Sequence, residues 1–148
     1  MSKKDEIQAM FKTAFQAHDD LAKTVLGELK SAILYEEVAQ NKKATGLSDG
    51  AIEQVVARQI KQREDAATLY RQGGAPDKAD QELREKAILV QFLPPQLTDE
   101  ELTAKVREVA GDHYDSAKRG QLIGAVKKAV GNAADGARVA KAVQRYFA

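Results

Sequence analysis

Apolar residues recur at intervals of three and four positions along almost the whole chain, and no stretch alternates long enough to form a strand. This spacing places apolar side chains on one face of an α-helix. The pattern therefore predicts an all-α protein: an N-terminal bundle of long helices followed by a small three-helix C-terminal domain. The predicted helices cover roughly residues 3–17, 20–41, 49–72, 76–93, 99–110, 116–130 and 136–147.

The apolar stripes also predict which side chains form the core. In the helices before residue 95 each stripe is long enough to pack against several neighbours, and in the helices after it each stripe is shorter. The main predicted core positions are Ile7, Phe11, Ala14, Phe15, Leu21, Val25, Leu26, Leu29, Ile33, Val38, Ile52, Val56, Ile60, Ala67, Tyr70, Leu83, Ala87, Ile88, Phe92, Leu122, Ile123, Val126, Val130, Val139, Val143 and Phe147.

The strongest interruption of the helical pattern is Pro94-Pro95. Two successive prolines cannot continue a helix, and a proline moves the residue before it away from helical geometry. We therefore predict two domains, residues 1–95 and 96–148. Just beyond the boundary, Thr98 and Glu101 have the spacing of a capping box, and Asp135 is placed to cap the last helix.

Charge is distributed unevenly along the chain. The whole sequence carries a formal charge of +1, but residues 116–148 contain seven cations and one acid and are therefore formally +6. A cluster of positive charge on a small folded unit is typical of a surface that binds a polyanion or an acidic protein. The predicted RNA-binding residues are Lys118, Arg119, Lys127, Lys128, Arg138, Lys141 and Arg145.

Three of these cations share a face of the last predicted helix. Arg138, Lys141 and Arg145 are spaced i, i+3, i+7, while Val139 and Val143 occupy another face. The cationic stripe should therefore face solvent or a partner, where it could contact several phosphates. A solvated helix face with no partner is the alternative interpretation of the same stripe.

The sequence contains no constellation typical of an enzyme. There is no Cys, which excludes disulfides and thiolate metal sites, and no nucleotide-binding or nucleophile motif is present. The spacing of Asp112, His113 and Asp115 suits no common metal site. We therefore predict no catalytic residues, no metal and no cofactor. No apolar run is long enough to span a membrane and no signal peptide is recognisable, so a cytoplasmic protein is expected.

Taken together, five segments resemble the YqeY family, which is related to the C-terminal part of the GatB subunit of aspartyl/glutamyl-tRNA amidotransferase. The combination of a Leu-Pro-Pro-Gln-Leu junction with two glycine-containing segments after it is specific, and the resemblance covers essentially the whole chain. The segments that carry it are residues 29–33, 58–63, 93–102, 120–124 and 131–136.

The resemblance implies a two-lobe helical fold whose C-terminal domain is related to one that touches tRNA. Carried over, it implies a non-catalytic tRNA-binding or tRNA-metabolism accessory protein that docks RNA phosphates through the cations of the last two predicted helices. Two alternatives remain. One is an interaction adaptor for an aminoacyl-tRNA synthetase or an amidotransferase. The other, by kinship only, is a carbon–nitrogen ligase with glutamine as the amide donor.

Overall fold

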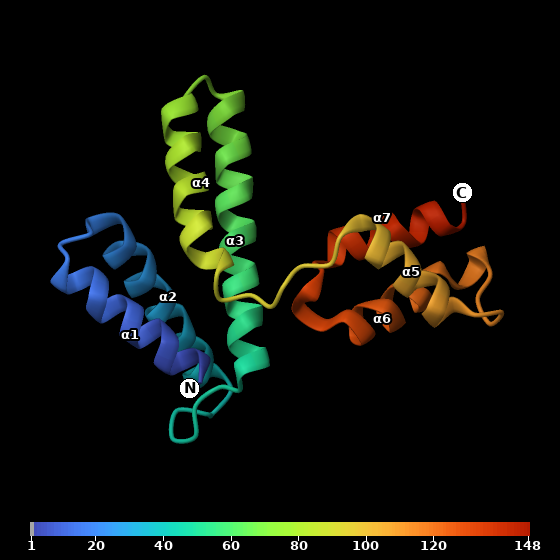
Figure 1. Ribbon diagram of the computed structural model, residues 1–148, viewed down its shortest axis with the longest axis horizontal. Helices are drawn as coiled ribbons and strands as arrows, with labels where there is room; N and C mark the ends of the chain where they lie inside the picture. The colour runs from blue at the N-terminus through green and yellow to red at the C-terminus, as the bar shows by residue number, and fades with distance from the viewer. Residues whose placement is uncertain (1) are drawn as a thin grey trace. The chain divides into compact units, whose positions relative to one another are not determined.

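The computed structural model describes residues 2–148, and within this range helices are the only regular secondary structure, which confirms the predicted all-α class. Figure 1 shows the course of the chain. The described residues form the α-helices α1 (Lys3–Gln16), α2 (Asp20–Ala39), α3 (Asp49–Gln72), α4 (Pro76–Val90), α5 (Asp99–Ala110), α6 (Arg119–Val130) and α7 (Gly136–Tyr146), with single 3₁₀ turns η1 (Ser116–Lys118) and η2 (Gly131–Ala133).

The chain divides into two compact units. The first ends at Leu93 and contains α1 to α4, and the second is Pro94–Ala148 and contains α5 to α7. The division falls directly before Pro94, where the two prolines prevent any helix from continuing. We describe each unit separately, because each has a hydrophobic core of its own.

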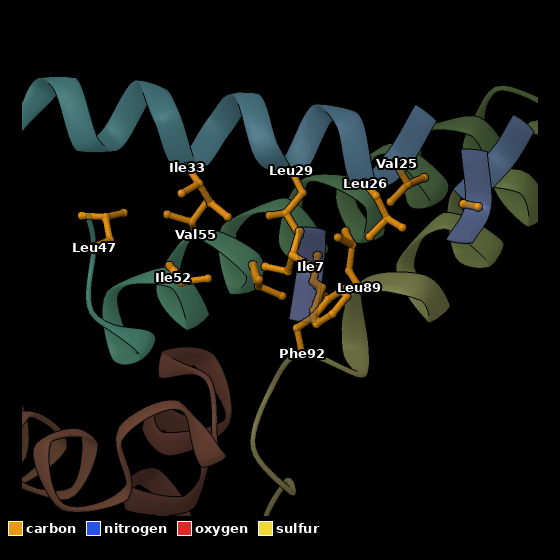
Figure 2. Close-up of a cluster of buried hydrophobic side chains, with 13 residues drawn as sticks. Ile7, Val25, Leu26, Leu29, Ile33, Leu47, Ile52, Val55, Leu89 and Phe92 are labelled. Carbon is orange, nitrogen blue, oxygen red and sulfur yellow. The ribbon is translucent and has the colours of Figure 1, made fainter. Parts of the chain in front are cut away.

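In the first unit, α3 and α4 form a long antiparallel hairpin, and α2 packs against α1, α3 and α4 (Figure 1). Figure 2 shows Leu26, Leu29 and Ile33 pointing from α2 toward side chains of the other three helices. Ile7 of α1, Ile52 of α3, Leu89 of α4 and Phe92, which follows α4, are 2% exposed or less. These side chains form one continuous apolar cluster that holds the four helices together.

The structure corrects several details of the predicted helices. The fourth helix ends at Val90 rather than at residue 93, and Ser116 belongs to the 3₁₀ turn η1 instead of opening α6. Val38, Phe15 and Tyr70 were expected in the core but are 56%, 59% and 37% exposed, respectively. On α2 the buried stripe follows a four-residue spacing, so position 37 rather than 38 faces inward. The buried residues of that stripe are Val25, Leu26, Leu29, Ile33 and Glu37.

Glu37 is therefore a carboxylate in the core of the first unit, with 2% of its surface exposed. It accepts a hydrogen bond of 2.8 Å from Lys4 Nζ and one of 3.2 Å from the Leu47 backbone N–H. The hydrogen bond from Lys4 is the main cause that lowers the pKa of Glu37, although burial acts in the opposite direction. Gly46 has a φ of +77°, and a Cβ there would lie 3.4 Å from Glu37 Oε2. The loop before α3 thus folds around this carboxylate.

A second charged group, Arg63 of α3, is 7% exposed and links three helices. Its Nη2 donates a hydrogen bond of 2.7 Å to Glu28 of α2, and its Nε lies 3.6 Å from Glu85 of α4. Nη1 donates to Gln59 at 3.2 Å on the same helix. Glu82 lies beside this group, and burial together with the charge of Glu85 raises its pKa. Arg63 therefore binds α2, α3 and α4 to one another by charge as well as by packing.

In the second unit, α5, α6 and α7 pack pairwise around a separate apolar core. The segment before α5 is tied to the loop after α6, because the Leu97 N–H donates to the Ala133 carbonyl at 2.9 Å and the Gln96 side chain donates to the Asn132 carbonyl at 2.9 Å. The fully buried large side chains of this core are Leu102, Val106, Leu122, Val126, Val139 and Val143.

Candidate nucleic-acid interface

Two helices of the second unit, α5 and α7, start at defined side-chain caps. Thr98 Oγ1 accepts from the Glu101 N–H at 3.1 Å while Glu101 accepts from the Thr98 N–H at 3.2 Å, which is a reciprocal capping box on α5. Asp135 Oδ1 accepts a hydrogen bond of 2.7 Å from the Arg138 N–H and so caps α7. These caps fix where each helix begins, and therefore the direction in which its cations project.

Dividing the chain at Leu93 changes the interpretation of its charge. The first unit carries 14 cations and 15 acids and is nearly neutral. The second unit contains both extremes: residues 94–115, which include α5, sum to −4, while residues 116–148 sum to +6. The small domain is thus polarised within itself, with acids on α5 and its flanking loops and cations on α6 and α7.

Lys127 has an internal role that the sequence did not reveal. Its Nζ donates hydrogen bonds to the carbonyl oxygens of Gly131 at 2.6 Å and Ala134 at 2.9 Å. Gly131 turns the chain after α6 with a φ of +57°, a conformation that favours glycine. Lys127 therefore closes the C-terminus of α6 over the loop that leads to α7, and the structure does not present it as a free surface cation.

Arg138 is also engaged within the unit. Its Nη2 donates a hydrogen bond of 2.6 Å to the Leu97 carbonyl and one of 2.9 Å to Asp99 Oδ1. The hydrogen bond from Arg138 lowers the pKa of Asp99, and the charges of Arg145 and Lys141 act in the same direction. The three cations of α7 therefore lie on the side of the helix that faces Asp99, but only Arg138 is bonded to it.

The other five cations of the predicted set are exposed. The Arg119 guanidinium lies 5.9 Å from the centre of the Phe147 ring, a stacking contact that leaves its N–H groups available. Among the residues that the structure describes, the side chains of the other four make no hydrogen bond or ion pair. These four residues are Lys118, Lys128, Lys141 and Arg145.

Glycines on the outer surface of α6 leave its backbone uncovered. Gly120 and Gly124 are spaced i, i+4 and are both exposed, and an added Cβ at either position would meet no atom within 4 Å. Gly136, the first residue of α7, is equally open. A glycine in a helix costs about 0.5–1 kcal/mol relative to alanine. Among the described residues, no neighbouring atom requires a glycine at these positions.

Lys127 and Lys128 are adjacent in α6, so substituting each in turn separates the internal role of Lys127 from the loss of an exposed lysine. Lys127→Met removes two charge-assisted hydrogen bonds and is expected to destabilise the second unit by about 1.5–3 kcal/mol. The matched Lys128→Met variant loses an exposed side chain without internal partners, so its effect should stay within about 0.5 kcal/mol. Urea unfolding followed by circular dichroism, with hydrogen exchange on peptides of α6 and α7, measures both. Equal stability of the two variants would contradict the role assigned to Lys127.

In residues 2–148 no group of three acidic or histidine side chains is arranged to hold a metal ion. Over the same range, no helix combines the length and the apolar character needed to cross a membrane.

The chain is thus an all-α protein in the part that the structure describes, and its second unit gathers positive charge on η1, α6 and α7. A comparison with protein families gives the more particular result. The model of the family described as Yqey-like protein matches residues 4–147, so the chain belongs to the YqeY family. No curated protein matches the chain significantly.

Proposed function

We propose that this protein binds structured RNA, with tRNA as the foremost candidate, through the exposed cations of η1, α6 and α7. The single observation that carries the proposal is the set of five exposed cations in a rigid helical unit, four of which have no internal partner. We define the RNA-docking surface as Lys118, Arg119, Lys128, Lys141 and Arg145.

The geometry of these side chains supports phosphate contact in preference to base recognition. The cations stand on helices whose other faces are anchored in an apolar core, so their spacing is fixed before any ligand binds. The second unit has three aromatic residues, of which Tyr114 and Phe147 pack against its core. Few rings are therefore available to stack on bases, and recognition would depend on shape and on backbone charge.

The open glycines support the same mode of binding. A phosphate backbone can approach α6 closely at Gly120 and Gly124, where no side chain intervenes, and Lys128 lies one turn beyond Gly124 on the exposed side. Asp99 opposes anion binding at one edge, since its carboxylate lies beside the α7 cations. An RNA would therefore engage Lys141 and Arg145, whose side chains have no bonded partner, rather than Arg138, which is bonded to Asp99.

The proposal predicts a steep dependence of RNA affinity on salt. Each phosphate neutralised releases condensed counterions, so three to five engaged cations should lower log Kobs by roughly 3 to 4.5 per tenfold increase in salt. Fluorescence anisotropy with labelled tRNA, at several potassium chloride concentrations, gives the slope. A slope near zero, or no saturable binding at low salt, would show that the cationic helices do not bind RNA.

A further inference from the structure

The first unit leaves large apolar side chains exposed on one side of α2. Leu34, Tyr35 and Val38 are 49%, 76% and 56% exposed, and their i, i+1, i+4 spacing puts them on one face of the helix. In Figure 2 the opposite face of α2 supplies the buried residues. Single exposed apolar residues are ordinary, but a cluster of them on one helix face is typical of an interaction surface.

This apolar face continues into a hollow between α1 and α2. The hollow has a volume of about 640 Å³ and is lined by Phe11 and Phe15 of α1 and by small residues of α2, among them Gly27 and Ser31. Together with the exposed cluster, the α2 residues that line the hollow form a continuous strip along about three helical turns, roughly 17 Å long at 1.5 Å per residue. We call this strip the α2 outer face, and it consists of Gly27, Ser31, Leu34, Tyr35 and Val38.

Every acid of α2 already has a cationic partner within the unit. Glu28 is bound by Arg63 at 2.7 Å, Glu36 by Arg58 at 3.2 Å and Glu37 by Lys4 at 2.8 Å. Asp20 lies 3.6 Å from Lys23. The acids therefore contribute little uncompensated negative charge to the surface of α2.

The edge of the α2 outer face that borders α1 is, in contrast, cationic. Lys23 and Lys30 are spaced seven residues apart and reach over the rings of Phe15 and Phe11, with Nζ 5.5 and 4.2 Å from the ring centres. Among the described residues no carboxylate lies within ion-pair distance of Lys30. Lys23 is also the ion-pair partner of Asp20 at 3.6 Å, so Lys30 supplies the uncompensated positive charge at this edge. The α2 outer face thus combines apolar side chains with a lysine edge that carries net positive charge.

We propose that the α2 outer face binds an amphipathic helix of a partner protein, whose apolar ridge is flanked on one side by Asp or Glu. The small residues Gly27 and Ser31 admit a helix backbone, the exposed cluster supplies apolar anchors, and the lysines select acidic flanks. A second copy of this chain fits less well. Isologous pairing through the same face would add no new acid to the lysines, because the acids of α2 are engaged internally. This surface is independent of the RNA-docking surface.

The test uses two designed 20-residue peptides with the same leucine ridge, one flanked by Glu and the other by Lys. Each is labelled with fluorescein and titrated with the full-length protein while anisotropy is recorded. The Glu-flanked peptide is expected to bind saturably and more tightly than the Lys-flanked one. Tyr35→Ser with Val38→Ser should weaken it by at least about tenfold, since exposed aromatic anchors dominate such contacts. Leu69→Ser, at a 67% exposed position on α3, is the matched control and should change nothing.

Reversing the charge of the two lysines tests the proposed preference for acidic flanks. Lys23→Glu with Lys30→Glu is expected to invert the preference, so that the Lys-flanked peptide binds more tightly; circular dichroism checks the fold of each variant. Absence of saturable binding, equal effects of the α2 and α3 substitutions, or an unchanged preference after charge reversal would each overturn the proposal. So would a dimer, measured by sedimentation equilibrium, that is lost in the Tyr35→Ser and Val38→Ser variant.

Discussion

Reversing three cations of the RNA-docking surface together, Lys128→Glu, Lys141→Glu and Arg145→Glu, is expected to lower tRNA affinity by at least about hundredfold at moderate salt. Each substitution removes a phosphate contact and adds a repulsive charge, so the loss should be similar for different RNA sequences and the salt slope should fall. These side chains make no hydrogen bond or ion pair within the described structure, so the loss of stability should be small and limited to the lost attraction between Asp99 and the charges of Lys141 and Arg145. Anisotropy with labelled tRNA and urea unfolding provide the two measurements.

A matched control separates the surface from net charge. Lys12→Glu, Lys43→Glu and Arg84→Glu change the total charge by the same amount, at exposed positions of the first unit. This control should retain most of the affinity, losing only the weak long-range attraction that net charge supplies. If the control loses as much affinity as the α6–α7 variant, or if the latter still binds tRNA as tightly as the parent, the assignment of the surface is wrong.

Lys4→Met is expected to destabilise the first unit by about 2–3 kcal/mol, because it leaves the Glu37 carboxylate buried without its cation. We place the effect at the lower end for such pairs, since the Lys4 side chain is 54% exposed and water reaches the site. Adding Glu37→Gln should restore much of the loss, because a neutral amide oxygen can still accept from the Leu47 N–H. Urea unfolding of the single and double variants measures the coupling.

The same pair has a pH signature with a defined sign. The pKa of Glu37 is lowered in the folded protein, so its contribution is present above the ordinary glutamate pKa and is lost as pH falls through the lowered value. In the Lys4→Met variant the Glu37 carboxylate is buried without a cation, so protonation of Glu37 removes an unfavourable buried charge. The stability gap between the parent and Lys4→Met should therefore narrow on acidification from about pH 7 to pH 4. A gap that is independent of pH would show that Glu37 is not the group responsible.

Local chemistry explains why much of the fold was predictable. Helix starts coincide with short polar residues that cap them, such as Ser48 before α3 and Asp135 before α7, and these signals act within four residues of chain. The ends were less accurate: α4 stops at Val90, three residues before the predicted end. Proline excludes a helix at its own position and before it, but where the last turn unwinds depends on packing.

The candidate site was predictable in composition but not in the role of each side chain. The i, i+3, i+7 spacing placed Arg138, Lys141 and Arg145 on one side of α7, and their joint effect on Asp99 agrees with that placement. What spacing cannot show is that Arg138 bonds Asp99 and the Leu97 carbonyl, which come from residues about forty positions earlier. Lys127 and Lys128 look equivalent in the sequence, yet only one reaches the carbonyls of the following loop.

The sequence by itself determined the all-helical class, most helix starts, the membership in the YqeY family and the gathering of positive charge in the last 33 residues, because periodicity, caps and charge are properties of neighbouring residues. Only the tertiary structure decided which charges are available. Contacts between distant segments bury Glu37 and Arg63 and engage Arg138, the loop after α6 folds back onto Lys127, and Tyr35 and Lys141 stay exposed. The free energy of a charged or apolar group depends on whether water or another part of the chain surrounds it, and folding alone settles that.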